Sequence, residues 1–180
     1  MQLHLVDSDH RVAVALQIAF ARFPEVSVAH GDLLAVAKNC AVSPANSYGF
    51  MDGGIDLIYV KYFGPQIQQQ VHDAIARRPE GHLPVGASLV IRTTSARIPY
   101  LILAPTMLLP ESIDASHCYR ALRAVLRIAD DYAEISSEVY CPGLGTGVGK
   151  VQPADAASAM AEAYDDWRKC AHDTTQRLFT

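Results

Sequence analysis

The stretch CPGLGTGVGK at residues 141–150 places glycine at four alternating positions of a 180-residue chain that has only 11 glycines. It follows an apolar segment typical of a strand, SSEVY at 136–140, and precedes Pro153, which suits the first turn of a helix. Glycine lets a backbone turn sharply and approach a ligand closely. In open α/β sheets, ligands bind beyond the carboxyl ends of strands, so this strand-to-helix junction is a candidate ligand loop.

A second glycine-containing loop, SPANSYGFMDGGID at residues 43–56, stands in a similar context. It begins near the end of a predicted strand and leads to a helix predicted from Ile55, because Ile55, Ile58 and Tyr59 recur three and four positions apart. Unpaired N–H groups at helix N-termini favour anions, so two such loops side by side could hold a diphosphate. The alternative is that both are structural turns that use glycine for positive φ.

The whole chain alternates predicted strands and helices, which is typical of an α/β domain with a largely parallel sheet and helices on both faces. Ser8 or Asp9 can cap the first helix, and the last helix is expected to fray after Trp167. The predicted strands are 1–7, 26–30, 39–46, 87–93, 99–105 and 136–142, with the fourth and fifth as a hairpin or near neighbours. The predicted helices cover 11–23, a segment from Ile55, 65–78, 114–133 and a segment from Pro153.

Composition excludes several classes of protein. The net charge of −4 and the pI of about 5.9 argue against a general nucleic-acid binder, which is usually basic. No apolar run approaches the length of a membrane span, so no membrane association is expected. The four cysteines are scattered without metal-ligand spacing, so we expect no metal and no cofactor, and free thiols favour a reducing cytoplasm.

The common phosphate-binding motifs do not fit the 141–150 stretch. In G-x-G-x-x-G, the third glycine position is occupied by Val148. The P-loop fails as well, because Val151 follows Lys150 where Ser or Thr is required, and Leu144 replaces the first glycine. The loop is therefore neither a dinucleotide fingerprint nor a Walker A motif.

Four short motifs, in order, resemble those of the macro domain family, a three-layer α/β/α module that binds ADP-ribose. They are Gly31-Asp32-Leu33, Ser43-Pro44-Ala45-Asn46-Ser47, Gly53-Gly54-Ile55-Asp56 and Gly143-Leu144-Gly145-Thr146-Gly147-Val148. The resemblance covers about residues 31–167 and implies a central mixed, mostly parallel sheet within a single domain over 1–180. Residues 1–30 form an extra strand-helix-strand start. No final strand is predicted after the last helix, unless these early strands substitute for it.

The resemblance also implies roles in binding ADP-ribose or an ADP-ribosylated substrate. Asp32 would accept a hydrogen bond from the adenine amino group, although a turn or helix cap is the alternative for this residue. Asn46 would bind the distal ribose, with a turn-stabilising amide as the alternative. Main-chain groups of two loops would face the diphosphate and distal ribose, namely Gly53, Gly54, Ile55 and Asp56 in the first, and Gly143, Leu144, Gly145, Thr146, Gly147, Val148 and Gly149 in the second.

Hydrolytic relatives position water or substrate with an Asn and an Asp, which correspond to Asn46 and Asp56. The resemblance therefore implies hydrolysis of ADP-ribosyl or O-acyl-ADP-ribose linkages at the distal ribose without a metal. The alternatives are a reader module without turnover and a protein for another dinucleotide ligand. Gly149 stands where hydrolases of the family often have an aromatic residue. Another branch of the family uses a pair of lysines in the helix that contains Lys61, and Val60 occupies the first position of that pair, so Lys61 has no lysine partner. For Asp7, helix capping is favoured over a ribose contact.

Overall fold

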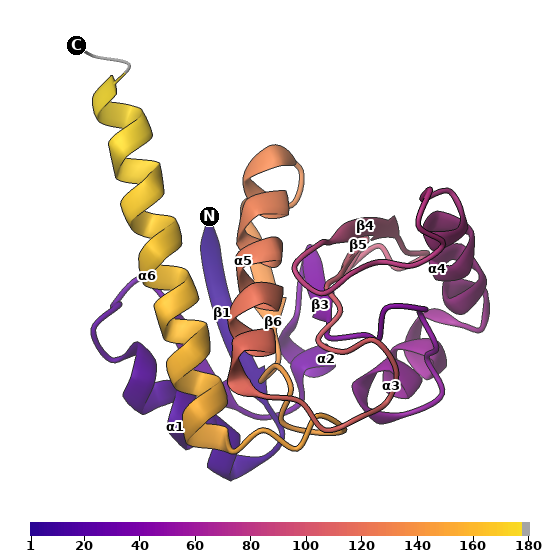
Figure 1. The fold of residues 1–180 in the computed structure, drawn as a ribbon, viewed down its shortest axis with the longest axis horizontal. Helices are drawn as coiled ribbons and strands as arrows, with labels where there is room; N and C mark the ends of the chain where they lie inside the picture. The colour runs from indigo at the N-terminus through magenta and orange to yellow at the C-terminus, as the bar shows by residue number, and fades with distance from the viewer. Residues whose placement is uncertain (178–180) are drawn as a thin grey trace.

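The computed structural model describes the backbone of residues 1–177 and the side chains of residues 1–170. Strands and helices alternate along most of this part of the chain, as the sequence predicts (Figure 1). The elements are β1 (Gln2–Asp7), α1 (His10–Phe20), β2 (Ser27–His30), α2 (Leu33–Val36), β3 (Cys40–Ser43), α3 (Gly54–Phe63), α4 (Gln66–Ala76), β4 (Leu89–Arg92), β5 (Tyr100–Leu103), α5 (Ala115–Asp131), β6 (Glu138–Cys141) and α6 (Pro153–Arg177).

The strands form one mixed sheet in the order β2-β1-β6-β3-β5-β4. Every pairing is parallel except the β4–β5 hairpin, so the expected mixed, mostly parallel sheet is confirmed. The first strand lies inside the sheet between β2 and β6, with Leu5 beside Cys141. An N-terminal strand thus fills an interior place in the sheet.

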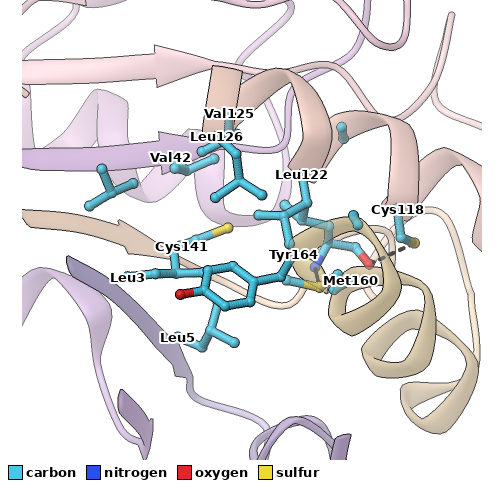
Figure 2. Packing of buried hydrophobic residues seen from close by; sticks show 14 of the residues in the cluster. Leu3, Leu5, Val42, Cys118, Leu122, Val125, Leu126, Cys141, Met160 and Tyr164 are labelled. Atoms are coloured by element: carbon cyan, nitrogen blue, oxygen red, sulfur yellow. Dashed lines mark hydrogen bonds between the residues drawn. The ribbon is translucent and has the colours of Figure 1, made fainter. Parts of the chain in front are cut away.

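Side-chain alternation along the strands separates two helical layers, which confirms the three-layer architecture. Leu3 and Leu5 of β1 join a core with α1, α5 and α6, whereas Val6 joins a core with α3 and α4. Successive strand residues point to opposite faces, so one strand serves both cores. Figure 1 shows α1, α5 and α6 on one side of the sheet and α3 and α4 on the other, and Figure 2 shows the first core, in which Tyr164 packs among β1, α5 and β6 residues.

Two features of the helices differ from the sequence prediction. The short helix α2 was not predicted, since four residues are too few for an amphipathic period to be visible. The expected fraying of the last helix after Trp167 is wrong, because the backbone of α6 stays helical to Arg177. An ion pair between Asp165 and Lys169, 3.0 Å apart at i,i+4 spacing, favours this continuation.

Candidate ligand-binding cleft

A cleft of about 780 Å³ opens at the carboxyl ends of the parallel strands. Its walls come from the turns or loops that follow β1, β2, β3, β5 and β6, within residues 6–12, 31–34, 44–58, 106–110 and 142–153. In an open α/β sheet, such loops converge on one edge and form the usual ligand site. The volume is in the range of sites for small organic ligands and cofactors.

The loop after β3 is organised by the side chain of Asn46. Its Oδ1 accepts hydrogen bonds from the backbone N–H groups of Tyr48 (3.1 Å) and Phe50 (3.2 Å), and its Nδ2 donates to the carbonyl oxygen of Phe50 (2.8 Å). Asn46 is buried and also lines the cleft. A primary amide has two N–H donors, so one N–H of Asn46 is left for a ligand after these contacts.

Asp56 lies in the first turn of α3, where its side chain is buried at the wall of the cleft. The hydroxyl of Ser43, at the end of β3, donates a 2.5 Å hydrogen bond to its Oδ1. Burial raises the pKa of Asp56 to about 6, and the bond from Ser43 acts in the opposite direction. A carboxylate with a pKa close to neutrality can exchange a proton under physiological conditions.

Three glycines of the loop after β6 are required by packing within the protein. Gly145 has a φ of +73°, and an added Cβ would lie 2.7 Å from the Sγ of Cys118. A Cβ on Gly149 would lie 2.6 Å from the carbonyl oxygen of Gly145, and one on Gly143 would collide with Val12. These positions therefore need glycine whether or not a ligand binds.

Gly53, Gly54 and Gly147 have a different environment. They are exposed, they line the cleft, and an added Cβ on any of them would meet nothing within 4 Å. Gly54 has a φ of +56° at the start of α3. At these glycines, on both walls of the cleft, no side chain covers the main chain. An anion in the cleft could therefore approach their N–H groups directly.

The structure gives Asp7 a role that neither sequence interpretation included. Asp9 is the N-cap of α1, since its side chain accepts from the N–H of Arg11, so the favoured expectation of helix capping by Asp7 is wrong. Asp7 instead accepts from the N–H of Gly143 through Oδ2 (2.9 Å) and from the N–H of Asp9 through Oδ1 (2.8 Å). It links the end of β1 to the start of the 143–149 loop.

Other candidate residues have mixed positions. Asp32 lines the cleft and caps α2, accepting from the N–H of Leu34 (2.9 Å), so its predicted capping role is present in the structure. Leu144 is fully buried in the core, and its carbonyl oxygen accepts the Sγ contact of Cys118. Leu144 does not line the cleft, and its backbone N–H donates to the Sδ of Met160 in the core (3.5 Å), so the ligand contact expected of it stays a prediction. Ile55, Thr146 and Val148 line the cleft as expected.

The charged side chains of the cleft are mostly acidic. They are the carboxylates of Asp7, Asp9, Asp32, Asp52 and Asp56 against the cations of Arg11 and Lys150. Carboxylates accept hydrogen bonds from hydroxyl and amino groups, whereas the anion-binding capacity lies in the main chain. The cleft thus suits a ligand that combines sugar or base donors with a compact phosphate group, and disfavours a long polyanion.

Two reactive alternatives receive no support from the geometry. Cys141 is buried, and burial raises the pKa of its thiol, which keeps it protonated and unreactive. Lys61 lies exposed in the last turn of α3, away from the cleft lining. Among the residues that the structure describes, no group of three or more His, Cys, Asp or Glu side chains could hold a metal ion, and no helix could cross a membrane.

Sequence reasoning missed the contacts that hold the loops in place. Ser43 was part of a motif only, although its position one residue after Val42 in a buried strand points it to the face that carries α3. Ile113 was not noted, yet its backbone N–H donates to the carbonyl oxygen of Gly149 (3.0 Å) and its side chain packs beside Gly145. No local pattern reports this contact, since the two segments lie far apart in the sequence.

Comparisons with known proteins agree with this fold. The family model described as Macro domain matches residues 42–160. An uncharacterized protein of Aquifex aeolicus is 34% identical over 139 residues, which cover 77% of this chain and 79% of that protein. The macrodomain of Mycobacterium tuberculosis DarG shares 23% identity with a TM-score of 0.66, over 77% of this chain and 88% of that one. Thermosipho africanus DarTG in complex with ADP-ribose shares 20% identity with a TM-score of 0.62, over 88% and 49% respectively.

Proposed function

Since this chain belongs to the macro domain family, we propose that it binds ADP-ribose in the cleft and hydrolyses a linkage at the distal ribose without a metal. The linkage would be an ADP-ribosyl or O-acyl-ADP-ribose bond. A structural neighbour, Thermosipho africanus DarTG, is described in complex with ADP-ribose, which supports the choice of ligand.

The cleft offers main-chain N–H donors for a phosphate and side-chain polar groups for a base and a sugar, which supports ADP-ribose as the ligand. Main-chain N–H groups around Gly53, Gly54 and Gly147 would receive the diphosphate from two sides, because no side chain stands over these residues. Asp32 would accept from the adenine amino group while keeping its bond to the N–H of Leu34, since a carboxylate has several acceptor sites. The free N–H of Asn46 would donate to the distal ribose.

The buried carboxyl of Asp56 is the observation that carries the proposal of catalysis. Its pKa of about 6 leaves it mostly ionised at pH 7 and able to take a proton from water. As the water oxygen attacks the linkage, its proton would pass to Asp56 and later to the leaving group. Ser43 holds Oδ1 in place, so the other oxygen of the carboxylate is assigned to the water. The diphosphate nearby would raise the pKa further.

Release of ADP-ribose from a mono-ADP-ribosylated substrate tests this function. Wild-type protein should release it, and kcat/KM should fall as the pH drops below about 6, the pKa of Asp56 in the ligand-free protein, because the protonated carboxyl cannot act as a base. Asp56→Ala should abolish release while calorimetry still finds ADP-ribose binding. Asp73→Asn, on an exposed part of α4, is the charge-matched control and should remain active. Full activity of Asp56→Ala would contradict the assignment.

A reader module without turnover is the second candidate, and a specific observation favours it. Both acceptor sites of Asn46 Oδ1 and one N–H of its amide are already used to hold the loop at residues 46–50. If this amide serves only the loop, the site can bind ADP-ribose but orients no substrate. Tight ADP-ribose binding without release from any modified substrate would identify the reader.

We also propose that the chain acts as one domain in a reducing, cytoplasmic setting. The strand β1 lies inside the sheet, so the first 30 residues are structurally inseparable from the rest. Cys40, Cys118 and Cys141 are free buried thiols, as expected where disulfides do not form.

A further inference from the structure

A side-chain hydrogen bond between Asp7 and Gly143 joins the N-terminal segment to the start of the candidate diphosphate loop. The parallel register of β1 and β6 places Leu5 beside Cys141. Asp7 and Gly143 each lie two residues further along the sequence from this pair. Here the Asp7 side chain accepts from the N–H of Gly143 at 2.9 Å. After the last paired residues of β1 and β6, the carboxylate of Asp7 thus links the two segments where the glycine loop begins.

The carboxylate of Asp7 joins two turns, because each of its oxygens has a different backbone donor. Oδ2 accepts from Gly143, and Oδ1 accepts from the N–H of Asp9 at the start of α1. Burial raises the pKa of Asp7, and these two hydrogen bonds act in the opposite direction by stabilising the ionised form. Burial of this half-buried side chain disfavours its ionised form, and each of the two backbone donors offsets part of that cost.

Packing reinforces the same contact. An added Cβ on Gly143 would collide with the side chain of Val12 in α1 and would lie 3.0 Å from Oδ2 of Asp7. The first residue of the loop is therefore held by a hydrogen bond to Asp7 and packs against the side chain of Val12 in α1. Both groups belong to the N-terminal segment, which lies before the residues 42–160 that match the family model.

We infer that Asp7 is a positioning residue, which fixes the start of the 143–149 loop so that its main-chain N–H groups face the diphosphate. The inference rests on the proposed binding of ADP-ribose. It assigns a ligand-organising role to a segment of the chain outside the family match, through a residue that acts on the ligand by way of the loop.

An amide cannot reproduce this geometry. Asn at position 7 has one acceptor oxygen, and its Nδ2 would be placed against either the N–H of Gly143 or that of Asp9, donor against donor. Asp7→Asn therefore keeps the size of the side chain and loses one of the two bonds. Asp73→Asn makes the same change of charge on the exposed surface of α4 and serves as the matched control.

Two measurements on the full chain test the inference. Hydrogen exchange of the ligand-free protein, followed by mass spectrometry, should show peptides over 143–151 exchanging about tenfold faster in Asp7→Asn, with the peptides of α5 unchanged. Calorimetry should show ADP-ribose affinity about tenfold lower in Asp7→Asn and unchanged in Asp73→Asn. If Asp7→Asn does not fold, Asp7→Ser replaces it, because serine is too short to reach Gly143.

The two measurements separate this inference from the proposed function. Unchanged loop exchange in Asp7→Asn would overturn the inference, and so would faster exchange with full ADP-ribose affinity. If wild-type protein does not bind ADP-ribose, the proposed function fails and the ligand role of Asp7 fails with it. In that case the exchange data still decide whether Asp7 holds the loop.

Discussion

In the loop after β6, Gly143, Gly145 and Gly149 have no room for a side chain, whereas Gly53 and Gly54 of the loop after β3 face open space. The loop after β6 is held by core contacts, whereas the loop after β3 is held at residues 46–50 by the hydrogen bonds of one buried amide, that of Asn46, and after them by the buried side chain of Met51. Glycines of such loops therefore meet two different requirements, close packing within the protein and access of a ligand to the main chain. Some glycines build the wall of the cleft, and others leave it bare for a ligand.

The largest expected effect is at a packed glycine. Gly149→Ala forces a Cβ against the carbonyl oxygen of Gly145, a backbone atom that cannot move aside cheaply. We expect the free energy of unfolding to fall by about 3 kcal/mol, or the melting temperature by about 6–12 °C. Thermal unfolding followed by circular dichroism checks this. A melting temperature equal to that of wild type would show that Gly149 has room for a side chain and that the two groups of glycines do not differ in packing.

The next effect concerns Asp56, the buried carboxyl in the first turn of α3. The pKa of Asp56 is about 6 in the folded protein against an ordinary value of 3.8, so the free energy of unfolding falls as the pH rises from about 4 to about 6 and stays at the lower level above that. Asp56→Asn should therefore raise the free energy of unfolding at pH 8 by up to about 3 kcal/mol. The gain should shrink towards pH 5, where the wild-type carboxyl is mostly protonated. Urea unfolding at both pH values measures it, and an equal gain at both would contradict the pKa assignment.

A smaller effect is expected for Asn46, whose side chain holds residues 46–50 of the loop after β3. Asn46→Ala removes three hydrogen bonds to the backbone of Tyr48 and Phe50, which water can partly replace because both residues are exposed. We expect a loss of about 1–2 kcal/mol, with faster hydrogen exchange confined to residues 46–52. Exchange that accelerates equally in the loop after β6 would show that the two loops are not independent.

The smallest effect on stability is expected at the open glycines. Gly53→Ala and Gly147→Ala meet no atom within 4 Å, and neither position has a positive φ. Unfolding free energies should stay within about 0.5 kcal/mol of wild type. ADP-ribose affinity should nevertheless fall about tenfold, because a methyl group now lies over the main chain. Calorimetry on these stable variants isolates the ligand role of glycine from its packing role.

The sequence was sufficient for the fold and for the position of the candidate cleft. Strand-to-helix alternation and the two glycine loops indicated an α/β sheet with a cleft at its edge, and the structure has both. The sequence could not distinguish packed glycines from open ones, since Gly145 and Gly147 stand in the same local pattern. Only the structure shows that Cys118 of α5 packs against Gly145 and that Gly147 has no such neighbour. Period-two alternation along β3 could have shown Ser43 facing α3, but the contact of Asp7 with Gly143 depends on β1 lying beside β6, which no local pattern encodes.

The central claim is that main-chain N–H groups of two neighbouring loops hold the diphosphate of ADP-ribose. Amide NMR of ¹⁵N-labelled protein titrated with ADP-ribose tests it most directly. The account predicts a saturable response with the largest shifts at the N–H groups of Gly53, Gly54 and Gly147, and little change in α4. Shifts that leave both loops unaffected, or no response to ADP-ribose at all, would contradict it.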